Sequence, residues 1–365
     1  MSVGTAEDLG ARAVHSDGWI QSPGFDLAFF ILSPIAGLAV ILAAPTSVGP
    51  VLALAAATLI GGPHYIATYS FYFFDDTAAY HKQRWVAYFL VPILIVFAVG
   101  VVALYEIPAV IVFVVFFWNA FHVARQSCGI LSIYRRRAGY GDQRHRAVTN
   151  FAILSTSFAM AVAHIDWYPQ LDNVLLKLSP YLPMLLSRLA LAAAVVGLVA
   201  LGVSIVKRLR SGSRYTIAEA GFLVTSLLLF HPYLWVEESN LATLGMLLGH
   251  FIQYLGIVWL LTNRKLAHRG GTRGQRWLSR VWLDPWILLP AALLIGGLFM
   301  VLQINFMALT VALVLLHFYL DGLFWAFSRP VIRNAITPYL TAGPQGTAAR
   351  RRGSVPCSSS SCVAR

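Results

Sequence analysis

Apolar runs of about 20 residues recur along almost the whole chain, and this is the length of helix that crosses a bilayer. At a rise of 1.5 Å per residue, such a helix spans a hydrocarbon layer about 30 Å thick. Only 12% of the 365 residues are charged, which is about half the share found in a soluble globular domain. Because so little polar surface is available to cover a water-soluble globule, the sequence predicts an all-α, polytopic membrane protein.

Ten apolar segments are predicted to cross the membrane as a helix bundle. Loops after the even-numbered segments carry the basic residues, such as the arginine run 135–137, whereas loops after the odd-numbered segments carry mainly acids, such as the pair 237–238. Basic loops stay in the cytoplasm. Both termini are therefore predicted to be cytoplasmic, in a protein of the bacterial inner (cytoplasmic) membrane. The segments cover residues 27–44, 50–74, 86–105, 108–131, 148–165, 182–206, 216–235, 241–262, 284–303 and 305–327.

Composition divides the chain into three regions. Residues 1–26 form a polar N-terminal segment, residues 27–335 the transmembrane helical domain, and residues 336–365 a basic, Ser-rich tail that is predicted to be disordered. The N-terminal segment lacks the basic start and early apolar stretch of a secretory signal. The first apolar segment is therefore expected to direct insertion.

Charge and cysteine content exclude two other classes of protein. The formal net charge is +12, but the basic residues lie in short loops between apolar segments. This pattern is typical of membrane topology and not of a nucleic-acid-binding face, so membrane lipids are expected partners and nucleic acids are not. Three cysteines, two of them in the tail, do not form a disulfide scaffold or a metal finger.

Four single histidines lie inside even-numbered segments at similar depths. They precede the next charged residue on the cytoplasmic side by 11, 13, 14 and 12 residues, which corresponds to roughly 16–21 Å of helix. One such histidine is explained most simply by a hydrogen bond across a helix interface. Four at one depth favour a shared metal centre near the middle of the membrane, because neutral imidazole binds iron, zinc and copper. The four are His64, His122, His250 and His317.

Two charged residues near these histidines are candidate catalytic residues. Asp321 follows His317 by four residues and shares its helix face, so it can bind the metal or orient another histidine. Arg125 follows His122 by three residues and can stabilise negative charge or pair with Asp321. Both are expected to face the protein interior, because facing lipid costs several kcal/mol. Thr68, four residues after His64, is expected in the same surroundings.

Many aromatic residues cluster in sequence around the four histidines. Some of them belong to lipid-facing surfaces and interfacial belts. Around a metal inside the membrane, however, aromatic walls suit a long apolar or conjugated substrate. Examples are Tyr65, Tyr69, Phe117, Trp118, Phe121, Phe251, Tyr254, Phe318, Tyr319 and Trp325.

Two alternatives remain open at this point. Two of the four histidines can hold a haem as axial ligands, which would make the chain a haem-binding membrane protein. A proton-coupled transporter is the other, with Asp321 and Arg125 as coupling residues and the break at residues 61–63 in the second segment. A di-iron desaturase is disfavoured, because the four histidines are single and do not form paired histidine boxes.

The stretch GGPHYIATY, residues 61–69, places a Gly-x-Pro-His motif in an early segment, and single histidines follow in later segments. This arrangement resembles the bacterial Brp/Blh-type membrane β-carotene 15,15'-dioxygenases. The resemblance implies O₂-dependent cleavage of a carotenoid double bond at an Fe(II) centre. It makes His64 the motif ligand and His122, His250 and His317 candidates for the others. The chain departs from the family at Tyr65, where the family usually has Gly.

The sequence thus predicts a membrane metalloenzyme with non-haem Fe(II), although haem or another transition metal is also compatible with the histidines. Its expected reaction is O₂-dependent oxidation or cleavage of an apolar lipid, such as a carotenoid or another polyene.

Overall fold

The computed structural model describes residues 18–73, 75–104, 108–269 and 306–341. All regular secondary structure within these ranges is helical, which confirms the predicted all-α class. In chain order the elements are α1 (Pro23–Asp26), η1 (Leu27–Ile31), α2 (Pro34–Ala43), α3 (Gly49–Ala56), η2 (Ala57–Gly61), α4 (Gly62–Ala67), η3 (Thr68–Phe73), α5 (Asp75–Gln83), η4 (Val86–Leu90), α6 (Val91–Leu104), α7 (Pro108–Arg137), α8 (Gln143–Ala161), η5 (Ile165–Trp167), α9 (Pro169–Leu178), α10 (Leu182–Arg210), α11 (Ile217–Leu228), η6 (His231–Leu234), α12 (Ser239–Arg269), α15 (Phe306–Phe324) and α16 (Pro330–Thr341).

The described helices include two to four candidate membrane spans. Leu182–Arg210 and Ser239–Leu266 are each long and apolar enough to cross a bilayer alone. Two bent pairs raise the number to four: Pro23–Ile31 with Pro34–Ala43, bent by 50°, and Thr77–Gln83 with Val86–Val102, bent by 90°. The other predicted segments also coincide with helices, but none of these described helices is long and apolar enough to count as a span by itself. Residues 284–303 lie outside the described ranges.

Proline and packing determine where some of these helices begin and end. Pro34, which has no backbone N–H, stands at the start of α2, where the first predicted segment bends. At the other end of the chain, α16 continues to Thr341, past the predicted start of the tail at residue 336. It does so with an apolar face buried against the bundle, including Ile336 and Leu340.

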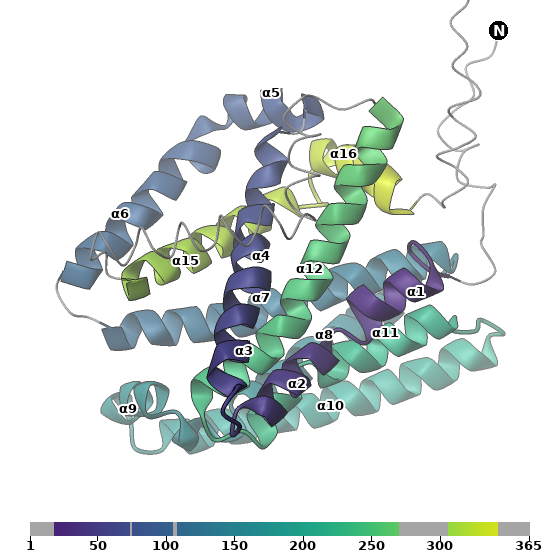
Figure 1. The fold of residues 1–365 in the computed structure, drawn as a ribbon. Helices are drawn as coiled ribbons and strands as arrows, with labels where there is room; N and C mark the ends of the chain where they lie inside the picture. Colours follow the sequence, from purple (N-terminus) through teal and green to yellow (C-terminus); the bar gives the residue numbers. More distant parts are fainter. Residues whose placement is uncertain (1–17, 74, 105–107, 270–305, 342–365) are drawn as a thin grey trace, which may run out of the picture.

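Two groups of helices cross each other in Figure 1. Helices α7, α8, α10 and α11 lie together, and α12 and the α3–α4 run cross their direction. Helix α15 contacts α4, α6 and α7, and α12 contacts α4. The elements α4, α7, α12 and α15 therefore meet in one region, and this region contains the candidate site.

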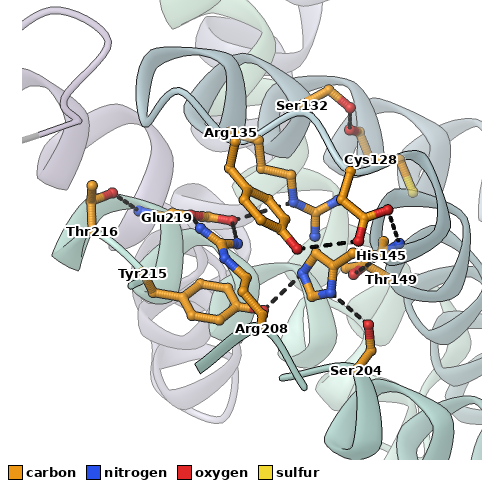
Figure 2. Close-up of polar contacts among 12 residues, drawn as sticks. Cys128, Ser132, Arg135, His145, Thr149, Ser204, Arg208, Tyr215, Thr216 and Glu219 are labelled. Atoms are coloured by element: carbon orange, nitrogen blue, oxygen red, sulfur yellow. Dashed lines mark hydrogen bonds and ion pairs between the residues drawn. The ribbon is translucent and has the colours of Figure 1, made fainter. Parts of the chain in front are cut away.

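A buried ionic network joins α7, α10 and α11 near their ends (Figure 2). Both Nη atoms of Arg208 donate to the carboxylate of Glu219, and Nε of Arg135 donates to Glu219 Oε1 at 3.3 Å. The Arg208 guanidinium lies between the rings of Tyr140 and Tyr215, at 3.7 and 3.8 Å from their centroids. All three charged side chains are buried, so two cations share one anion in the interior.

Candidate metal centre

Four helices bring the four predicted histidines together. The ring centroid of His64 lies 4.5 Å from that of His317 and 4.8 Å from that of His250. The ring of His122 lies 5.1 Å from that of His250 and 4.9 Å from that of His317. Each imidazole thus contacts two others, and the predicted convergence is met. They come from α4, α7, α12 and α15.

Ring nitrogens in this cluster lie at the spacing of ligands on a common ion. The Nε2 atoms of His64 and His317 are 3.0 Å apart. Two nitrogens that each bind one metal at about 2.1 Å, at right angles, are separated by about 3.0 Å. His64, His250 and His317 each offer a ligand atom within 4.8 Å of the other two.

Asp321 joins the cluster through one of its two oxygens. Its Oδ2 lies 3.8 Å from Nε2 of His122 and 3.8 Å from Nε2 of His317. These distances are too long for hydrogen bonds, but they leave room for bonds of about 2 Å from each atom to an ion between them. His122, His317 and Asp321 form a second group of ligand atoms within 4.8 Å, so His317 belongs to both groups.

The other oxygen of Asp321 anchors a chain of hydrogen bonds that fixes His317. Thr68 Oγ1 and the Tyr254 hydroxyl donate to Asp321 Oδ1 at 3.0 and 2.7 Å. Each hydroxyl has a single proton, so Thr68 Oγ1, 2.7 Å from His317 Nδ1, accepts there and Nδ1 carries the proton. We therefore assign His317 the tautomer in which Nε2 carries no proton and can bind a metal. Hydrogen-bond partners fix the tautomers of metal-binding histidines in the same way.

Unpaired nitrogens and dry surroundings also fit a metal. His250 Nδ1 and His122 Nε2 are buried without a hydrogen-bond partner, and such atoms cost free energy unless a ligand satisfies them. Aromatic rings exclude water: Phe251 lies 4.4 Å from the His64 ring and Phe318 lies 4.7 Å from the His122 ring. Neutral imidazoles with one carboxylate are a donor set for iron, zinc or copper.

Arg125 does not join the cluster, and the expectation that it faces the interior is wrong. Its side chain is exposed. The described partners of Asp321 are Thr68, Tyr254 and two histidines, so the predicted Arg125–Asp321 pair is not formed. The physical reason is rotation about the helix axis, because Arg125 continues an exposed face of α7.

Two of the contacting residues have roles that the sequence did not specify. Thr68 was expected beside His64, yet its hydroxyl contacts His317 and Asp321. Tyr254 was expected only as an aromatic wall, yet its hydroxyl donates to Asp321. The sequence did contain one indication of this role: Tyr254 follows His250 by four residues and therefore shares its helix face.

A Thr68→Val change should weaken metal binding by about 10- to 100-fold, as the loss of an outer-shell partner does elsewhere. Valine keeps the shape but removes the oxygen that accepts from His317 Nδ1. Thr68→Ser keeps the hydroxyl and should retain affinity close to that of the wild type. Titration of the metal-depleted variants with Fe(II) measures the difference, and equal affinities for the valine and serine variants would refute the tautomer assignment.

The geometry of the histidine cluster is the basis for the function proposed below. Comparison of the chain with protein-family models, with curated proteins and with solved structures found no match.

Proposed function

We propose that the chain is an integral membrane metalloenzyme, a non-haem Fe(II) oxygenase that uses O₂ to oxidise or cleave an apolar lipid. A carotenoid or another polyene is such a lipid, as the resemblance of residues 61–69 to the Brp/Blh-type dioxygenases implies. The single observation that carries the proposal is the convergence of four imidazoles and Asp321, with the Nε2 lone pair of His317 directed at its neighbours.

The proposed topology has ten spanning helices, both termini in the cytoplasm and a location in the bacterial inner membrane. The alternation of basic and acidic loops supports this topology. In this arrangement the centre lies near the middle of the membrane.

Each residue of the centre has a defined role in the proposal. His64, His122, His250 and His317 hold the iron, and Asp321 Oδ2 completes the ligand set. Bound iron supplies the redox chemistry that O₂ activation requires. Thr68 and Tyr254 hold Asp321 and His317 in place, and the surrounding aromatic rings keep water from the reacting lipid.

The geometry supports non-haem iron over haem. A haem must place its flat ring system between two axial imidazoles. Here each imidazole contacts two others at centroid distances of 4.5 to 5.1 Å. Whichever two imidazoles were the axial ligands, the other two would occupy the space that the haem ring needs.

Metal content tests the proposal directly. Protein purified in detergent without added metal should contain about one iron per chain by elemental mass spectrometry. Its visible spectrum should lack a Soret band. A Soret band would reassign the chain to the haem proteins. The absence of every transition metal would contradict the metalloenzyme and leave the proton-coupled transporter, whose flux should then depend on pH through the histidine range.

A further inference from the structure

The buried centre comes closest to the protein surface on the side of α7. His64, His250 and His317 are 0%, 1% and 0% exposed, whereas the side chain of His122 is 10% exposed. His122 is therefore the most accessible of the four rings in the described part of the chain. A lipid that approaches the centre from the bilayer meets it first at His122.

An exposed stripe on α7, called here the entry stripe, runs beside His122. Its residues recur at intervals of four, three and four, which keeps them on one face of the helix. The ring of Trp118 contacts Phe318 of α15 at 6.1 Å, and the ring of Phe318 lies 4.7 Å from that of His122. Aromatic contacts thus lead from the stripe to the centre. The entry stripe consists of Val114, Trp118, Phe121 and Arg125.

Arg125 is the one charged residue of this otherwise apolar stripe. It forms no hydrogen bond or ion pair with the residues that the structure describes. Helix α7 is continuous from Arg125 to Arg135, so the two lie about 15 Å apart along its axis. A guanidinium that faces hydrocarbon at this depth costs several kcal/mol, and an anion beside it removes most of that cost.

We propose that the entry stripe binds the substrate as a single-chain lipid with a carboxylate end. The carboxylate pairs with Arg125, whose guanidinium matches it with two parallel hydrogen bonds. The chain lies over Phe121 and Trp118, beside His122. This inference rests on the proposed function and narrows its substrate from apolar lipids in general to long-chain carboxylic acids, polyene acids included, which excludes hydrocarbon carotenoids.

The depth of Arg125 selects this lipid over a phospholipid. A phosphodiester headgroup stays at the membrane interface with two chains below it. Arg135 belongs to the predicted cytoplasmic loop. Arg125 lies ten residues before it, which is about 15 Å deeper along the helix axis. A single-chain carboxylate is small enough to follow Arg125 to that depth.

Fluorescence quenching tests the inference without turnover. The probes are 9,10-dibromostearic acid, its methyl ester and a brominated phosphatidylglycerol, added to the purified full chain in detergent without O₂. Bromine quenches tryptophan fluorescence on contact. The quenching that is lost in the Trp118→Phe variant comes from Trp118, so this difference measures binding at the entry stripe. The acid should bind the wild type at least about tenfold more tightly than the ester, as one charge-assisted pair provides.

Variants of Arg125 decide the outcome. Arg125→Gln should reduce acid affinity to that of the ester. Arg125→Lys keeps the charge but not the two parallel hydrogen bonds, so it should keep only part of the preference. Arg136→Gln, a change of an exposed arginine on the same helix, should leave the acid affinity unchanged. Equal acid affinity in the wild type and Arg125→Gln would overturn the inference, as would tighter binding of the phosphatidylglycerol than of the acid. Because the assay does not need iron, either result is independent of the metal measurement.

Discussion

Replacing His317 with alanine should remove the bound iron and abolish turnover. His317 belongs to both groups of ligand atoms, with Nε2 3.0 Å from His64 Nε2 and 3.8 Å from Asp321 Oδ2. Its loss therefore separates the two groups. Replacing a residue that only hydrogen-bonds to a metal ligand lowers metal affinity by about 10- to 100-fold. Loss of a ligand itself should therefore leave less than about a tenth of the wild-type iron after purification.

The matched control is His164→Ala. His164 stacks on Trp167 at 4.0 Å, away from the cluster, and its replacement should leave iron content unchanged. His317→Asn, which is closer in volume, guards against a folding defect, and circular dichroism and size-exclusion chromatography establish that each variant is folded. A folded His317→Asn protein with wild-type iron would place the metal elsewhere.

Glu219→Gln should lower the free energy of unfolding by about 3–5 kcal/mol, the cost of breaking a buried ion pair. Arg208 and Arg135 are both buried and both donate to this one carboxylate. Glutamine keeps the shape of the side chain but leaves two buried cations without an anion. Denaturant unfolding in detergent, followed by circular dichroism, measures the change.

Two further variants make this prediction specific to the network. Glu237→Gln replaces an exposed glutamate and should leave stability unchanged. Arg135→Met should be tolerated, because both Nη atoms of Arg135 are buried without partners and its removal leaves one cation with one anion. If Glu219→Gln unfolds at the wild-type denaturant concentration, the buried pair contributes no net stability.

The convergence of the histidines was predictable from the sequence because helices convert residue number into depth. Counting from the loop charges placed His64, His122, His250 and His317 at one level, and their rings are in contact. The i, i+4 relation likewise associated Asp321 with His317. Neither argument needs knowledge of how the helices pack.

Rotation and cross-helix pairing were not predictable in the same way. Apolar residues occupy both the exposed and the buried faces of α7, so its hydrophobic pattern did not show that Arg125 follows the exposed Trp118 and Phe121. The contact of Thr68 with His317 joins residues 249 positions apart. The partners of Glu219 likewise depend on how three helices are placed.

The connection between His64 and His317 spans 253 residues, from the second predicted segment to the last. A chain that enters the membrane as it is synthesised therefore holds three of its histidines long before the fourth is made. The ligand set is complete only after α15 has been inserted against α4 and α7. If the proposed metal binds here, its complete ligand set forms late in biogenesis, after α15 has been made.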